Sequence, residues 1–96
     1  MRSQLDPSAL GHKRMLMLRA IHACWLVHGQ GPKYRQLQAL GGWPEVKHHN
    51  LMEALAAGGW ITGAGDVANS TRLTQAAYRA LGWDEPVILA NRRTVA

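Results

Sequence analysis

Two side chains in the first third of the chain, Cys24 and His28, have the types and spacing of a small chemical site. They lie four residues apart, so a helix would present both on one face, where they could bind a metal ion. The same pair could act as a nucleophile with its base. Neither chemistry is favoured, because no second pair of ligands stands at a comparable spacing and the apolar run around Cys24 predicts a buried thiol without access.

Three other groupings fail for separate reasons. His48 and His49 are adjacent, so a helix points them to different faces. The glycines within 63–65 neither open a helix nor follow a long strand, and a hairpin turn is expected there in place of a phosphate cradle. Asp84-Glu85 is the one close carboxylate pair and is expected in an exposed turn. We therefore expect a protein that is not an enzyme and that holds no metal and no cofactor.

The most informative polar residues lie on an expected helix at 44–57. Its core-facing stripe is expected to consist of Met52 and Leu55, with His48 or Leu51 one turn earlier. The opposite face carries Glu45, Val46, Lys47, His49, Asn50 and Glu53. An α-helix fits the major groove of B-DNA, where Asn, Lys and His can hydrogen-bond to base edges. Either this face contacts DNA or it is an ordinary solvated helix face.

The elements that position this face follow from helix stop signals and apolar runs. A long helix is expected from about Leu10 to His28, after a cap at Asp6 or Ser8. Its apolar residues cover more than one stripe, so we expect it to be buried on several sides, under other helices or in a dimer seam. The remaining expected elements are a helix at 35–40 with Leu37 and Leu40 inward, the helix opened by Pro44 and running to Ala57, strands at 60–62 and 70–73, and a helix at 75–81 capped by Thr74.

This order of elements predicts a mainly α fold with a small β-hairpin (α+β), arranged as a winged helix-turn-helix. The 96 residues form one expected domain, with 1–8 as a flexible N-terminus and 83–96 as a C-terminal extension. The run from Met15 to Val27 is interrupted by Arg19 and His22 and is shorter than the roughly 20 residues of a membrane span. No membrane association is expected.

Charge points to an anionic partner. The formal net charge is +5, and the basic residues are concentrated at the two ends of the chain. Residues 1–35 hold six Lys or Arg against one Asp, whereas residues 36–70 hold one Lys against three acidic residues. The single cysteine excludes an internal disulfide and fits a reducing compartment. We expect a cytoplasmic, nucleoid-associated protein whose partner is double-stranded DNA.

Residues 31–61 resemble a known family. The runs Pro32-Lys33-Tyr34-Arg35-Gln36-Leu37, Ala39-Leu40-Gly41 and Leu55-Ala56-Ala57-Gly58-Gly59-Trp60-Ile61 are similar to the DNA-binding domain of LexA-type repressors, with one residue fewer in the second helix. The segment 72–81 more loosely resembles the wing exit and the following helix of MarR-like regulators. The two resemblances cover about half the chain. The chain departs from the LexA pattern at Pro44 and His48, and none of the 96 residues resembles the self-cleavage domain, so no autoproteolysis is expected.

The resemblance implies roles for particular residues. The positions where the family contacts bases are occupied by Val46, Lys47, His49 and Asn50. Phosphate contacts are expected from Lys33, Tyr34, Arg35 and Arg72, and among these Arg35 matches the family's arginine. Glu45 and Glu53 flank the base-contacting face. The expected wing at 63–69 contains no Lys or Arg, so we expect it to contribute little to affinity.

The sequence thus predicts a small sequence-specific transcriptional regulator, a repressor that occupies promoter DNA. As a homodimer it would place two 44–57 helices about one DNA turn apart on a palindromic site. No small-molecule effector is evident. A protein–protein interaction module is the main alternative, favoured by the non-basic wing, the acidic flanks and the four tryptophans. A third possibility is an architectural or replication-associated factor that binds DNA without sequence preference.

The sequence also predicts where each of the four tryptophans lies. Trp25 and Trp60 are expected in the core. Trp43 and Trp83 either pack in the core as well or act as exposed anchors for another chain.

Overall fold

The computed structural model of the chain describes residues 5–42, 44–63 and 70–89. It is mainly helical with one small two-stranded antiparallel sheet, which confirms the predicted α+β class. The elements are the 3-10 turn η1 (Pro7–Ala9), the helices α1 (Gly11–His28), α2 (Tyr34–Gly41) and α3 (Glu45–Ala57), the strands β1 (Ile61–Thr62) and β2 (Arg72–Leu73), and the helix α4 (Gln75–Leu81).

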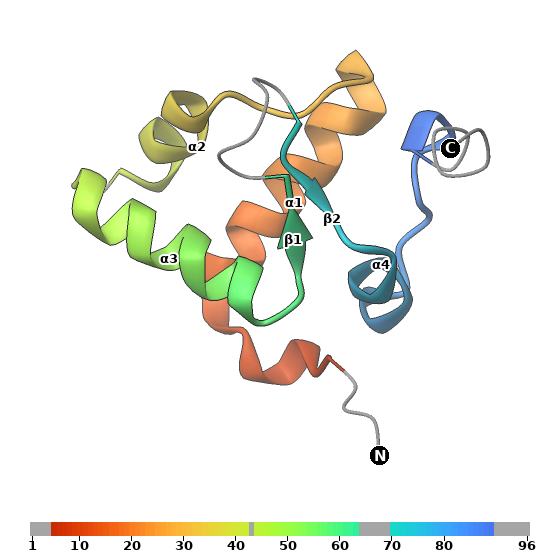
Figure 1. Cartoon of the computed structure of the whole chain (residues 1–96), viewed down its shortest axis with the longest axis horizontal. Coiled ribbons are helices and arrows are strands. Elements are labelled where there is room, and N and C mark those ends of the chain that lie inside the picture. The colour runs from red at the N-terminus through yellow and green to blue at the C-terminus, as the bar shows by residue number, and fades with distance from the viewer. Residues whose placement is uncertain (1–4, 43, 64–69, 90–96) are drawn as a thin grey trace.

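The helices surround the hairpin in two layers. α1 runs behind the hairpin, with α2 and α3 on one side and α4 on the other (Figure 1). α1 contacts α2 and β2, α2 contacts α3, and α3 contacts β1. In the hairpin Ile61 pairs with Leu73, and both side chains are buried against the helices. The hairpin therefore fixes where α3 ends and where α4 begins.

The core lies between α1 and the layer formed by α3 and the hairpin. Its buried apolar residues are Leu10, Met17, Leu18, Ile21, Trp25, Leu37, Met52, Leu55, Trp60, Ile61, Leu73, Ala77, Tyr78 and Leu89. Trp25 and Trp60 belong to this core, as predicted. The Trp25 Nε1 atom donates a hydrogen bond of 2.8 Å to the Thr71 carbonyl oxygen, which ties α1 to the start of β2. Partly buried Trp83 packs at the edge of the core.

Individual residues determine where α4 begins and how closely the two strands approach each other. Thr74 caps α4 as predicted, because its Oγ1 accepts a hydrogen bond of 3.0 Å from the Ala77 backbone N–H. The same hydroxyl donates a 2.6 Å hydrogen bond to the Gly59 carbonyl oxygen and so joins the two ends of the hairpin. Gly63 has φ of 82°, and a Cβ there would collide with the Ser70 carbonyl oxygen. Glycine at this position lets the two strands approach each other.

Several element boundaries differ slightly from expectation. Pro44 is the N-cap of α3 and not its first residue, because its ψ of 155° is not helical. α2 is one residue longer at each end than the predicted 35–40. The strands are shorter than predicted, since only two residues of each form ladder pairs. Residues 87–89, which follow Pro86, are helical.

One prediction about burial is wrong, and another is met only in part. Leu40 was expected to face inward but is 52% exposed, at the end of the short helix α2. α1 was expected to be buried on several sides, under other helices or in a dimer seam. In the single copy Leu26 and Val27 are 59% and 74% exposed, so the other helices leave this part of α1 uncovered. Leu5, in the segment predicted to be flexible, packs against the core.

Candidate nucleic-acid interface

α3 separates its residues into a buried and an exposed face. Met52 and Leu55 are buried, as predicted, and of the two candidates one turn earlier it is His48 that is buried. All four predicted base-contacting residues are exposed, namely Val46, Lys47, His49 and Asn50. Lys47 and Asn50 form no side-chain hydrogen bond or ion pair with any other described residue. These two side chains are therefore available for a ligand, and they offer an ammonium group and an amide.

A row of charged residues runs along one flank of this face. Glu45, His49 and Glu53 follow one another at a spacing of four residues, so they lie along one side of α3. The His49 Nε2 atom is 3.4 Å from a carboxylate oxygen of Glu53, and both side chains are exposed. His49 is thus already engaged when it is protonated. An anionic ligand that approaches this flank meets two carboxylates.

Tyr34, a predicted phosphate contact, lies beside the same row. Its ring packs edge-on against the ring of His48, with centroids 4.5 Å apart and an interplanar angle of 71°. The pKa of the Tyr34 hydroxyl is raised, chiefly by burial and also by the negative charges of Glu45 and Glu53. The hydroxyl therefore remains a hydrogen-bond donor at neutral pH. Tyr34 connects the start of α2 to the exposed flank of α3.

His48 is the polar residue that the core contains. It is 0% exposed, and among the described residues neither ring nitrogen has a hydrogen-bond partner. Burial lowers its pKa, and the neighbouring His49 lowers it further, whereas the Tyr34 backbone has a smaller effect in the opposite direction. A neutral imidazole therefore occupies this position in the core.

Acidification is expected to destabilise the fold through His48. In the unfolded chain the imidazole titrates near its ordinary pKa of 6.5, whereas in the native state its pKa is lowered. The unfolded state then binds the additional proton first, so the free energy of unfolding falls as the pH drops below about 7 and stops falling below the native pKa. The pKa of His22 is lowered as well, by burial and against the effect of Asp84, so it acts in the same direction.

Urea unfolding at a series of pH values measures this effect. His48→Leu should weaken the pH dependence of the free energy of unfolding at pH values above those at which carboxylates titrate. The part of this dependence that comes from His22 should remain. His12→Leu is the matched control, since His12 is exposed on α1. It should keep the full pH dependence of the parent. A His48→Leu variant with the parent's pH dependence would contradict this role of His48.

The start of α2 brings two cations to the edge of the interface. Lys33 and Arg35 are both exposed. The Lys33 backbone N–H donates a 2.8 Å hydrogen bond to the Gln36 Oε1 atom, and this bond fixes the first turn of α2. Both side chains extend from a helix N-terminus, which favours anions through its partial positive charge. Their position suits contacts with phosphate.

Arg72, a predicted phosphate contact, also forms a hydrogen bond within the hairpin. It is half-buried on β2, and its Nη1 atom donates a 3.0 Å hydrogen bond to the Ser70 carbonyl oxygen. Ser70 in turn donates a 2.9 Å hydrogen bond from its hydroxyl to the Gly63 carbonyl oxygen. The guanidinium group thus stabilises the base of the hairpin. A guanidinium has five N–H donors, so others are left for a ligand.

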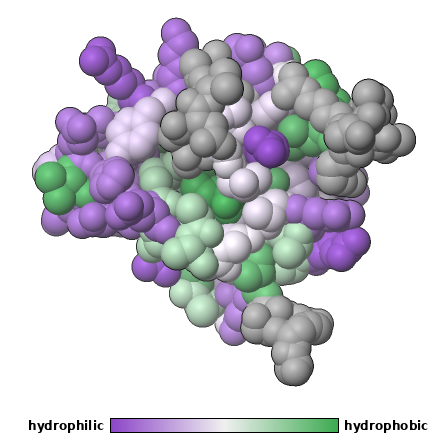
Figure 2. All heavy atoms as spheres, viewed as in Figure 1, coloured by the Kyte–Doolittle hydropathy of each residue, from purple (hydrophilic) through white to green (hydrophobic). Residues whose placement is uncertain are grey.

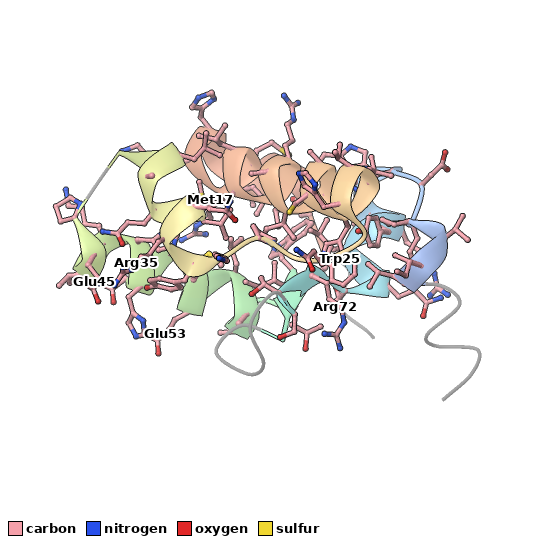
Figure 3. All side chains as sticks on the ribbon, turned by 90° about the horizontal axis from the view of Figure 1, so that it is seen from above. Met17, Trp25, Arg35, Glu45, Glu53 and Arg72 are labelled. Atoms are coloured by element: carbon pink, nitrogen blue, oxygen red, sulfur yellow. The ribbon has the colours of Figure 1, made fainter. Side chains whose placement is uncertain are left out.

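Arg72 and Glu53 lie on the side of the molecule that faces away from α1 (Figure 3). Seen from above, Glu53 and Arg72 project away from α1, whereas Met17 and Trp25 point from α1 into the core (Figure 3). The surface over α2 and α3 on this side is mostly hydrophilic (Figure 2). The predicted wing tip, Trp43 and the Arg92-Arg93 pair lie outside the described residues.

Sequence patterns did not reveal two ring contacts. The ring of His22 stacks on Trp83 with centroids 5.1 Å apart, and it meets Tyr78 edge-on at 5.5 Å. These residues are far apart in the sequence, so no local spacing could have indicated the contacts. Cys24 is partly exposed on α1, and burial raises the pKa of its thiol. Within the described ranges, no three His, Cys, Asp or Glu residues gather as metal ligands would.

Comparisons with protein-family models, with curated proteins and with solved structures find no match to this chain. Among the described helices, none has the length and apolar character needed to cross a membrane.

Proposed function

We propose that the chain is a winged helix-turn-helix domain that binds double-stranded DNA as a sequence-specific transcriptional repressor. In this proposal α3 enters the major groove, α2 lies across the phosphate backbone, and the hairpin is the wing. The chain acts by occupying DNA and not by catalysis, and it works as a homodimer. Lys33 and Arg35 neutralise phosphates, while Lys47 and Asn50 contact base edges.

The observation that carries this proposal is the two-sided character of α3. The helix is anchored through His48, Met52 and Leu55, so its orientation is fixed before any ligand binds. Its other side presents Lys47 and Asn50 to solvent. A rigid helix with exposed amide and ammonium groups suits the major groove, where Asn makes paired hydrogen bonds to adenine and Lys to guanine. Nearby cations on α2 add the attraction to phosphate that such binding needs.

Asn50→Ala tests the base-contacting role. In fluorescence anisotropy with the preferred duplex and a scrambled duplex, the variant is expected to bind the preferred duplex about 5-fold to 100-fold more weakly, as for the loss of one good base contact. Binding to the scrambled duplex should stay unchanged. Gln75→Ala is the matched control, because it also removes an exposed amide, but from α4. If Asn50→Ala keeps the parent's preference, the residue assignment on α3 is wrong.

The carboxylates beside Tyr34 favour a second candidate, a winged helix that binds another protein. Glu45 and Glu53 would repel phosphate but could pair with lysines or arginines of a protein partner. Exposed Val46 adds an apolar contact on the same helix. This candidate predicts that random duplex DNA binds weakly and without preference, whereas a basic partner protein binds in a salt-sensitive way.

A further inference from the structure

The contact between α2 and α3 encloses a side chain that can change its charge. His48 of α3 is 0% exposed, and within the described residues neither of its ring nitrogens has a hydrogen-bond partner. The ring of Tyr34, at the start of α2, packs edge-on against the ring of His48, with centroids 4.5 Å apart. Tyr34 is itself 39% exposed, so its ring separates His48 from solvent on this side. The enclosed imidazole is stable only in its neutral form, because a buried charge needs an ion pair or hydrogen bonds.

The groups around His48 do not stabilise a positive charge in place. The ionisable side chains of α2 are the neutral Tyr34 and the cationic Arg35. β1, which also contacts α3, has no ionisable side chain, and the buried side chains of α1 are not ionisable either. On α3 itself, the neighbouring His49 repels a second positive charge. Among the described residues no carboxylate is buried, so His48 has no anionic partner in the core.

The nearest carboxylates lie on the outer side of the Tyr34 ring. Glu45 and Glu53 are exposed on α3, and their negative charges contribute to the raised pKa of the Tyr34 hydroxyl. Glu45 precedes His48 by three residues and is therefore its neighbour along the helix surface. A protonated His48 can reach water and this carboxylate only if the Tyr34 ring moves away.

α2 is attached to the rest of the protein by few buried side chains. Leu37 is the one buried residue of this helix, which the structure describes in full, whereas α1 buries four residues. A segment with little buried apolar surface opens locally at a lower free energy than the whole fold. Tyr34 lies one helical turn before Leu37 and adds the ring contact with His48. Movement of α2 is thus the least costly way to expose His48 to solvent.

We propose that Tyr34 and His48 form a pH-sensitive latch, in which protonation of His48 releases α2 from α3. In the closed state the neutral imidazole is enclosed under the Tyr34 ring, and in the open state the imidazolium is hydrated and lies near Glu45. The open state takes up the proton near the ordinary pKa of 6.5, whereas the closed state takes it up only at lower pH. The ratio of open to closed copies therefore rises by up to about 10-fold between about pH 7.5 and about pH 5.5.

The latch joins the two parts of the candidate nucleic-acid interface. α2 carries Arg35, and α3 carries Lys47 and Asn50. The closed latch holds these groups at a fixed separation, whereas α2 has no fixed position relative to α3 when the latch is open. Open copies do not present both sets of groups to one duplex, so acidification reduces the fraction of copies that can bind. This consequence rests on the proposed function, but the latch itself does not.

Amide hydrogen exchange measured by NMR without DNA tests the latch. Protection factors, corrected for the intrinsic effect of pH on exchange, report the opening of each segment. The hydrogen-bonded amides of α2, such as that of Leu37, are expected to be less protected than those in the middle of α1. Their protection factors should fall by up to about 10-fold between about pH 7.5 and about pH 5.5. If α2 is as protected as α1, or if its protection does not change with pH, the proposal is overturned.

His48→Leu removes the titrating group from the latch. The α2 amides of this variant should have protection factors that do not change between these two pH values. His49→Gln is the matched control, because it removes a neighbouring imidazole that is exposed on the same helix, and it should keep the parent's fall. A His48→Leu variant with the pH dependence of the parent overturns the proposal. Circular dichroism checks that each variant is folded, and if His48→Leu is not, the pH series of the parent decides.

A second series with duplex DNA separates the latch from the proposed function. DNA that spans α2 and α3 binds the closed state, so it should raise the protection factors of the α2 amides. If no duplex binds in fluorescence anisotropy while the pH dependence of α2 is as expected, the proposed function fails and the latch is retained. If DNA binds but leaves the protection of α2 unchanged, the link between the latch and the interface is wrong.

Discussion

Replacing Trp25 with alanine is expected to lower the free energy of unfolding by about 3–5 kcal/mol, as for other large core aromatics. Trp25 is 2% exposed and lies where α1 meets the hairpin. Its truncation leaves a cavity and also removes the hydrogen bond from Nε1 to the Thr71 carbonyl oxygen. Small domains are stable by only about 5–15 kcal/mol, so the variant should be near the edge of folding at room temperature. Urea unfolding followed by circular dichroism measures the change.

Trp25→Phe separates the two contributions. The phenyl ring fills part of the same volume but has no N–H group, so the expected loss is smaller, about 1–3 kcal/mol. If Trp25→Ala lowers the free energy of unfolding by less than about 1 kcal/mol, the site would behave like an exposed position. That result would contradict the position of Trp25 in the core between α1 and β2.

Arg35→Glu is expected to weaken binding to duplex DNA about 10-fold to 100-fold at low salt, because it removes one phosphate contact and adds a repulsive charge. The slope of the logarithm of the affinity against the logarithm of salt should become shallower by about one. Arg35 is exposed at the start of α2, beside the N-terminal end of that helix. Fluorescence anisotropy over a range of salt concentrations measures both quantities.

The matched control is Arg79→Glu, which makes the same change of charge on α4. Arg79 is exposed, and α4 lies on the other side of the hairpin from α2 and α3 (Figure 1). Its affinity should change only through the net charge, by much less than that of Arg35→Glu. Equal losses in the two variants would mean that the interaction with DNA is diffuse and is not centred on α2.

Much of the fold could be predicted from the sequence because its signals are local. Thr74 ahead of α4 and the glycines after α1 and α3 define helix ends within a few residues. Helical spacing predicted Met52 and Leu55 as buried but left His48 and Leu51 as alternatives, between which the structure selects His48. Leu40 and Val27 could not be predicted in this way. Their exposure depends on how the helices pack against one another, which local spacing does not reveal.

The residues of the candidate interface could be predicted from the sequence, but the contacts between its helices could not. Spacing places Val46, Lys47, His49 and Asn50 on the outer side of α3, and the structure does the same. The pairing of His49 with Glu53 was within reach of the sequence, because it follows from their separation of four residues. The packing of Tyr34 on His48 was not, since it depends on the angle between α2 and α3. The same holds for the stack of His22 on Trp83.

Selection from a random duplex library at near-physiological salt, followed by sequencing of the bound pool, tests the central claim most directly. Specific DNA binding by α3 predicts that one short sequence becomes enriched and that Asn50→Ala changes the enriched bases. A folded protein that enriches no sequence would contradict the claim that this chain is a sequence-specific DNA-binding domain.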